Sequence, residues 1–261
     1  MHDKINRHEP RALSFLDRIR SRTPARVLAG SAGAGYRTGT QLELRQAHAA
    51  ARDAVRTELD LQRDLGAECL RRWELFEVWT QARSKDEYLL RPDLGRQLRD
   101  DAIRTIQARC SSQPDLGVVI GDGLSVTAVS AQVPGLLPLI TQRAKDRGWI
   151  VGQPFVIRYC RVGLMNQIGD LLAPKVVALL IGERPGLATA ESLSAYMAYR
   201  PRAGHSDANR NLISNIHARG VPQEAAAERI INLAAQMMRR ERSGVEIKEE
   251  LGGTQPDKLT P

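Results

Sequence analysis

The pattern that most constrains the fold is an alternation of short apolar runs and helix-like stretches after Cys110. The clearest run is 176–181, Val-Val-Ala-Leu-Leu-Ile, whose lack of polar side chains predicts a strand that is buried on both faces. Further strands are expected at 116–120, 154–159 and 193–199. Alternation of this kind predicts an α/β fold with a Rossmann-like, mainly parallel sheet and helices on both faces.

Helical stretches separate and follow these runs. They are expected at 134–147, 165–172 and 222–243. The last of them carries apolar residues at helical spacing, which predicts one buried stripe. Pro222 suits the first turn of this helix, and Gly244 suits the position just beyond its end.

The chain before Cys110 is predicted to be helical. Ala, Leu, Arg and Glu dominate 41–65, where a stripe includes His48, which we expect to be a packed core residue. A second helical stretch covers 98–109. A short amphipathic helix is expected at 12–19, and the Gly-rich run 30–35 is expected to be a flexible loop.

These changes of pattern divide the chain into three parts. Residues 1–40 form an N-terminal segment that resembles a targeting sequence, 41–110 a helical domain, and 111–261 a Rossmann-like domain. The boundary near 110 follows from the turn residues Ser-Ser-Gln-Pro-Asp that come directly after it. The last residues, 252–261, are expected to be a frayed tail.

Composition excludes several classes of protein. No run approaches the ~18 uninterrupted apolar residues of a membrane span, and the N-terminus lacks the apolar segment of a secretion signal. Three widely spaced cysteines form no disulfide framework. The net charge of +8 is spread along the chain and aromatic residues make up only 4%, which disfavours nucleic-acid binding. The excess charge instead favours an anionic ligand or a more acidic partner protein.

Two loops follow predicted strands at the edge where ligands bind in open parallel sheets. The loop at 121–125, Gly-Asp-Gly-Leu-Ser, offers glycines for close approach and a serine to cap the next helix. A tight strand-to-helix turn explains it equally well, and it matches no nucleotide-binding fingerprint. The loop at 182–187 places Glu183 and Arg184 at the end of a buried strand, where they need a ligand or an ion pair, mutual or between domains.

A third loop, 210–220, contains Asn215-x-His217-x-x-Gly220. This is one residue away from the Asp-x-His-x-x-Gly motif, in which a histidine ligates the cobalt of cobalamin. The missing carboxylate normally orients such a histidine, so we expect His217 to lie at a helix boundary near a backbone carbonyl. Cys160 is expected to be inert within a strand. With no metal-ligand cluster and no nucleophile elbow, the sequence favours a binding subunit without catalytic residues of its own.

At these loops the chain resembles the small (light) subunit of bacterial ethanolamine ammonia-lyase. The resemblance is carried by 176–195, which contains Gly-Glu-Arg-Pro-Gly-Leu, and by 211–217, Asn-Leu-Ile-Ser-Asn-Ile-His. Four further segments follow the order of the family: 23–27, 49–55, 88–95 and 119–125.

The resemblance implies an enzyme that converts ethanolamine to acetaldehyde and ammonia with adenosylcobalamin. In this family a (β/α)8-barrel large subunit holds the substrate and the radical chemistry, and six large subunits assemble with six small ones. The small subunit closes over the cobalamin at the interface and is inactive alone. The enzyme lies in the bacterial cytoplasm, in many bacteria inside a microcompartment, to whose shell the N-terminal segment can direct it. Contact with nucleic acid or membrane is not implied.

The resemblance also implies three cofactor-binding residues: Val162, Glu183 and Leu212. Glu183 would accept hydrogen bonds from corrin amides, and the other two would offer backbone groups and apolar contacts. Leu212 departs from members that carry Cys at this position, which makes a role for a thiol untenable. An alternative reading, which rests on the glycine-containing loop at 121–125, is a stand-alone nucleotide-binding enzyme with a Rossmann-like fold. A nucleic-acid or scaffold-binding protein, based on the charge, is a third.

Overall fold

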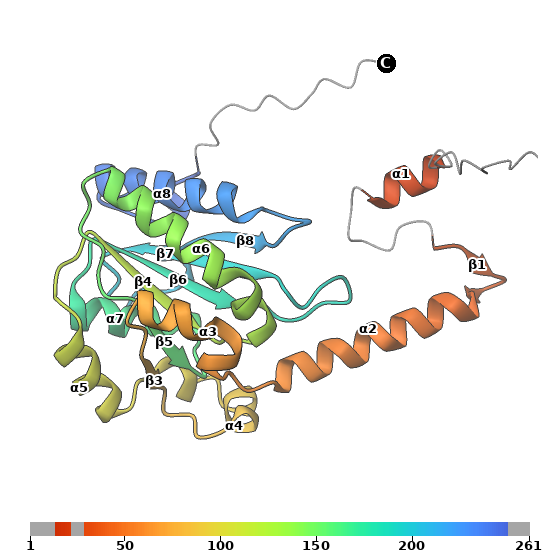
Figure 1. The fold of residues 1–261 in the computed structure, drawn as a ribbon, viewed down its shortest axis with the longest axis horizontal. Coiled ribbons are helices and arrows are strands. Elements are labelled where there is room, and N and C mark those ends of the chain that lie inside the picture. Colours follow the sequence, from red (N-terminus) through yellow and green to blue (C-terminus); the bar gives the residue numbers. More distant parts are fainter. Residues whose placement is uncertain (1–13, 22–28, 250–261) are drawn as a thin grey trace, which may run out of the picture.

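The computed structural model describes residues 14–21 and 29–249. Its centre is a six-stranded sheet with the strand order β3-β5-β4-β6-β7-β8 (Figure 1). The four strands β3, β5, β4 and β6 are mutually parallel, whereas β7 runs antiparallel to β6 and to β8. The predicted α/β class with a mainly parallel sheet is therefore confirmed. The strands are β3 Glu77–Trp79, β4 Leu116–Gly121, β5 Phe155–Arg158, β6 Val176–Gly182, β7 Leu193–Tyr199 and β8 Asn211–Ile216.

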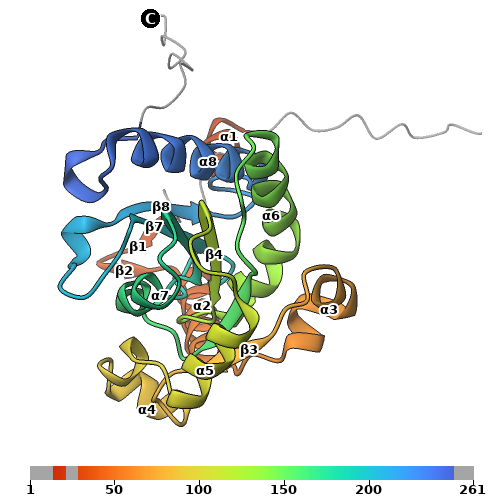
Figure 2. The same ribbon diagram turned by 90° about the vertical axis from the view of Figure 1, so that its left-hand side faces the viewer.

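Helices cover both faces of this sheet, as Figure 2 shows for α6 and α8 on one side and α5 and α7 on the other. Along β4 the side chains alternate between the two layers. Val118 and Ile120 pack in the core beneath α6 and α8, whereas Val119 packs in the core beneath α5 and α7. The helices are α1 Phe15–Ser21, α2 Thr38–Arg56, α3 Leu61–Arg72, α4 Lys85–Leu90, α5 Asp100–Arg109, α6 Val126–Asp146, α7 Met165–Leu172 and α8 Gln223–Arg240.

Two strands of the six-stranded sheet lie where no strand was expected. β3 falls in the part of the chain that we expected to be helical, and it forms one edge of the sheet beside β5. β8 falls in the expected loop at 210–220 and forms the opposite edge. Both are short edge strands, and their sequences mix polar with apolar residues, so they lack the apolar run that marks a central strand. The division of the chain near residue 110 stays a prediction.

Two helix ends also differ from expectation. α6 begins eight residues before Pro134, because the Ser125 side chain caps it by accepting a hydrogen bond of 3.2 Å from the Ala128 N–H. Both Pro134 and Pro138 lie inside α6, although proline normally interrupts a helix. α8 ends at Arg240, and the next residue, Glu241, itself adopts the left-handed conformation. Gly244 lies three residues further on, so its expected position just beyond the helix was wrong.

The N-terminal part extends from the body of the molecule. In Figure 1, α2 projects away from the sheet, and none of its residues is buried. His48 is accordingly exposed, so its expected place in the core was wrong. The expected flexible loop at 30–35 contains a small hairpin of β1 Ser31–Ala32 and β2 Gly35–Tyr36. Half of the expected targeting segment 1–40, and all of the expected tail at 252–261, lie outside the described residues.

No helix in the described part of the chain is both long and apolar enough to cross a membrane.

Candidate functional site

The sheet offers a ligand site at the carboxyl edge of its parallel strands. β4 continues into α6 on one face, whereas its neighbour β5 continues into α7 on the other face. The chain segments that leave the two strands therefore diverge and open a crevice, which is the usual ligand position in open α/β sheets. Side chains of β7 and β8 complete the wall: Ser194, Tyr196, Leu212 and Ser214.

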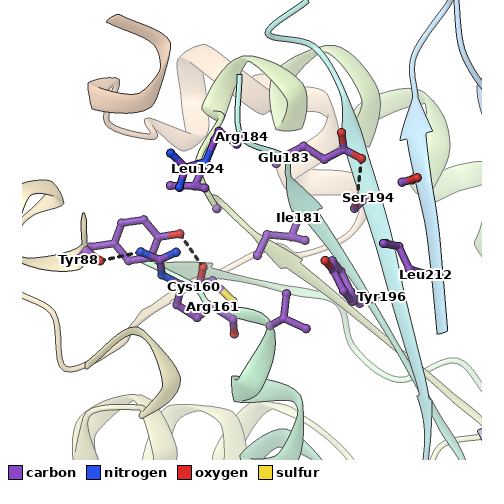
Figure 3. Close-up of a pocket in the computed structure, with 14 residues that line it drawn as sticks. Tyr88, Leu124, Cys160, Arg161, Ile181, Glu183, Arg184, Ser194, Tyr196 and Leu212 are labelled. Atoms are coloured by element: carbon purple, nitrogen blue, oxygen red, sulfur yellow. Dashed lines mark hydrogen bonds between the residues drawn. The ribbon is translucent and has the colours of Figure 1, made fainter. Parts of the chain in front are cut away.

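A pocket of about 410 Å³ occupies this position, and it is open on one side (Figure 3). It brings together all three residues that the sequence resemblance singled out, Val162, Glu183 and Leu212, from three separate elements. Leu212 is 46% exposed, and Val162 is half-buried. The full lining is Tyr88, Gly123, Leu124, Cys160, Arg161, Val162, Ile181, Gly182, Glu183, Arg184, Ser194, Tyr196, Leu212 and Ser214.

Glu183 is the most firmly oriented polar group in this pocket. Its Oε2 accepts a hydrogen bond of 2.6 Å from the Ser192 hydroxyl. Its Oε1 accepts one of 2.6 Å from the Ser194 hydroxyl and one of 2.9 Å from the Asn215 N–H. Three of the roughly four acceptor positions of a carboxylate are thus filled. The remaining one can accept a hydrogen bond from a ligand without reorientation of the side chain.

Arg184 does not pair with Glu183. Its side chain is exposed on the pocket rim, and the ion pairs found among the described residues do not include it. Hydroxyl and backbone donors hold the Glu183 carboxylate, whereas the Arg184 guanidinium is exposed. The expected ligand role of the two charges stays a prediction.

The glycines of the loop at 121–125 lie close to neighbouring segments. Gly123 has a φ of +57°, and an added Cβ would collide with the carbonyl oxygen of Gly182. A Cβ on Gly121 would lie 2.9 Å from both Cβ and Sγ of Cys160. The glycines therefore allow the loop to pack against its neighbours. Since Gly123 and Leu124 line the pocket, the loop forms part of its wall.

Asp122 connects this loop to the end of β5. Its carboxylate is fully buried and accepts hydrogen bonds of 2.9 Å from the N–H groups of Tyr159 and Cys160. Lys85, also buried, donates a hydrogen bond of 2.9 Å to the Gly123 carbonyl. Burial raises the pKa of Asp122, and the nearby Lys85 ammonium opposes that rise. Burial likewise lowers the pKa of Lys85, an effect that the carboxylate opposes.

Two pocket residues that the loop analysis missed are Tyr88 and Arg161. The Tyr88 hydroxyl donates to the Cys160 carbonyl at 3.1 Å, and Arg161 donates to the Tyr88 carbonyl at 2.9 Å (Figure 3). The Arg161 guanidinium lies 4.2 Å from the centre of the Tyr88 ring, a cation–π contact. The resemblance at 88–95 was the one sequence signal for this part of the wall.

Cys160 is buried, and burial raises the pKa of its thiol well above the ordinary value. A protonated thiol is a poor nucleophile, in keeping with the expected lack of reactivity. The residue follows β5 and does not lie within it.

His217 lies at the end of β8, so its expected place at a helix boundary was wrong. The side chain is 4% exposed and both ring nitrogens have partners. Nε2 lies 2.7 Å from Asn215 Oδ1, and Nδ1 accepts a hydrogen bond of 3.3 Å from the Arg219 N–H. Nδ1 thus faces a backbone donor, and Nε2 faces the Asn215 side chain. Neither nitrogen is available to a metal. Nor do the described residues contain any group of three or more His, Cys, Asp or Glu side chains able to hold a metal ion.

Comparison with known proteins decides the family. Residues 14–248 match the model of the ethanolamine ammonia-lyase light chain. The chain belongs to this family. It is 39% identical over 233 residues to the ethanolamine ammonia-lyase small subunit of Clostridium acetobutylicum, covering 89% of this chain and 94% of that protein. The identity to the small subunit of Clostridium perfringens is 41% over 230 residues, covering 88% and 76%. The identity to the small subunit of Clostridioides difficile is 39% over 237 residues, covering 91% of this chain and 78% of that protein.

Membership of this family confirms the identification made from the sequence. The family provides a subunit of ethanolamine ammonia-lyase, a carbon–nitrogen lyase. The name small subunit, which these relatives carry, implies that they have a large subunit as partner. The matched range begins one residue before α1 and continues past α8, and therefore includes every wall of the pocket.

Proposed function

We propose that this chain holds adenosylcobalamin for an ethanolamine ammonia-lyase and closes over the cofactor where it meets the large subunit. The observation that carries the proposal is the convergence of Val162, Glu183 and Leu212 on one open pocket at the carboxyl edge of the sheet. These residues are distant in sequence and come from separate segments of the chain.

The chemistry of the pocket fits a corrin. A corrin is a broad, mostly apolar ring bordered by amide side chains. Val162, Ile181 and Leu212 provide apolar walls, and Glu183 keeps one acceptor position free for an amide N–H. The pocket is open on one side, as expected of a site that a second protein completes.

The reaction is then divided between the subunits. Adenosylcobalamin supplies, when bound, a cobalt–carbon bond that can break homolytically. This chain contributes position and exclusion of water, because its described pocket contains no paired acid and base and no activated nucleophile. His217 does not ligate cobalt, since both of its nitrogens are already bonded. The substrate, ethanolamine, is bound by the large subunit.

We further propose an assembly of six large and six small subunits in the bacterial cytoplasm. The exposed helix α2 offers a surface for the large subunit, because none of its residues is buried in the isolated chain. The segment 1–40 directs the chain to a microcompartment shell where the organism builds one.

Co-expression with a barrel-type large subunit tests the proposal. We expect formation of acetaldehyde that requires ethanolamine, adenosylcobalamin and this chain together. Activity that persists when this chain is omitted would contradict the proposal. Equilibrium binding of adenosylcobalamin to the complex provides a second readout, and the affinity should fall in Glu183→Ala.

A further inference from the structure

A second pocket adjoins the first and has a different character. Its volume is about 600 Å³, and it shares Arg161, Val162 and Tyr196 with the pocket that contains Glu183. The titratable side chains in its walls are mostly basic. They are Arg96, Arg161, His205 and Arg210, against the single carboxylate of Asp207.

The one carboxylate is already neutralised. Asp207 pairs with Arg210, whose side chain is only 5% exposed. Arg210 also donates a hydrogen bond of 3.0 Å to Asn166 Oδ1, while its Nε has no acceptor in the described part of the chain. Asp207 therefore neutralises Arg210 only. It does not neutralise the positive charges of the other two arginines in the pocket, Arg96 and Arg161.

Arg96 and Arg161 carry this unbalanced charge. The ion pairs formed by residues 14–21 and 29–249 include neither guanidinium. Arg161 donates a hydrogen bond to the Tyr88 carbonyl, and its buried Nε lacks an acceptor among the described residues. Arg96 lies against Gly163, where an added Cβ would come within 3.2 Å of its Cδ. The absence of a side chain at residue 163 thus makes room for the arginine.

We propose that this second pocket, the basic pocket, is a subsite for a phosphate oxyanion. Two guanidinium groups without carboxylate partners present planar pairs of N–H donors, which match the oxygens of phosphate. Because the two pockets share a wall, a ligand held at Glu183 can extend into the basic pocket. If the chain holds adenosylcobalamin as proposed above, the oxyanion is the phosphodiester that links the corrin to its nucleotide base. This identity of the ligand rests on the proposed function. The alternative source of the same chemistry is free phosphate.

The test compares two corrinoids on the complex of this chain with a large subunit. Adenosylcobalamin contains the phosphodiester, whereas adenosylcobinamide lacks both the phosphodiester and the base. Equilibrium dialysis gives the affinity for each, and calorimetry gives the affinity for inorganic phosphate alone. The variants are Arg96→Gln and Arg161→Gln. Arg104→Gln, which removes the same charge from an exposed position on α5 outside both pockets, is the matched control.

We expect Arg96→Gln to weaken adenosylcobalamin binding by roughly 10-fold, as for the loss of one charge-assisted hydrogen bond, and to leave adenosylcobinamide binding unchanged. Arg104→Gln should change neither. Equal weakening for both corrinoids, or no effect on any of the three ligands, would overturn the subsite.

The remaining outcomes show whether the oxyanion is the phosphodiester of the cofactor or free phosphate. If Arg96→Gln abolishes binding of inorganic phosphate without affecting adenosylcobalamin, the subsite exists and its ligand is free phosphate. If the wild-type complex binds neither corrinoid, the proposed function fails. The phosphate measurement then decides alone whether the basic pocket binds an anion.

Discussion

The buried carboxylate of Asp122 accepts a hydrogen bond of 2.9 Å from the backbone N–H of Cys160. This bond joins the segment that follows β4 to the segment that follows β5. Arg161 and Val162 come directly after Cys160 and line both pockets. The position of the proposed cofactor contacts therefore depends on a residue that is itself fully buried.

We expect Asp122→Ala to lower the free energy of unfolding by about 3 kcal/mol, because it leaves two buried N–H groups unbonded and removes the charge that balances Lys85. Asp122→Asn, which keeps an acceptor oxygen, should lose less. Urea unfolding monitored by circular dichroism measures both. The matched control is Asp53→Ala on α2, whose carboxylate is 75% exposed, and it should change stability by less than about 0.5 kcal/mol. Equal losses for Asp122→Ala and Asp53→Ala would contradict a connecting role.

Glu183 differs from Asp122 because its carboxylate faces the pocket. Glu183→Gln keeps the shape of the side chain, but it replaces one acceptor oxygen by an NH2 group that must face a hydroxyl or backbone donor. We expect the affinity of the complex for adenosylcobalamin to fall by roughly 10-fold, the value of a charged hydrogen bond. Glu191→Gln, an exposed neighbour outside the pocket, is the control for loss of charge. Unchanged affinity in Glu183→Gln would remove this residue from the proposed contacts.

The central part of the fold could be predicted from the sequence because its signals are local. The helix at 165–172 and the strand at 193–199 have the bounds that we expected. Uncharged apolar runs such as 176–181 admit few structures other than a buried strand. The edge strand β8 could not be recognised in this way. Only Ile213 and Ile216 point into the core, and the residues between and beside them are polar or exposed.

The site was predictable in part, for a related reason. Glu183 was noticeable because a charge follows a buried strand. The hydrogen-bond donors to Glu183 could not be recognised from the sequence. Ser194 and Asn215 approach the carboxylate only through the pairing of β7 with β6 and β8. The contact of Tyr88 with Arg161 spans 73 residues of sequence. No local pattern marks such a contact.

His205 predicts a dependence of stability on pH. Burial lowers its pKa below 6.5, and the charges of Arg202 and Arg210 lower it further, against the opposing effect of Asp170. Below pH about 6.5 the unfolded chain therefore binds more protons at this residue than the folded chain, so this contribution to stability falls as the pH is lowered. Urea unfolding midpoints at pH 5.5 and 7.5 should differ less in His205→Gln than in the wild type. A difference of the same size in both proteins would exclude His205 as the cause.

Gly123 tests whether the loop after β4 is shaped by packing. Alanine there must adopt a φ of +57° and place its Cβ against the Gly182 carbonyl and 2.6 Å from Ile181 Cγ1. Gly148 is a matched control, because its φ is +73° and an added Cβ would meet no atom within 4 Å. Gly148→Ala should therefore cost only the backbone strain, about 1 kcal/mol of unfolding free energy. Gly123→Ala should cost clearly more, because β6 must also move, and it should weaken adenosylcobalamin binding since β6 carries Glu183 at its end. Equal losses of stability in the two variants would mean that the loop can accommodate a Cβ at residue 123. Glycine would then be needed there only for its positive φ.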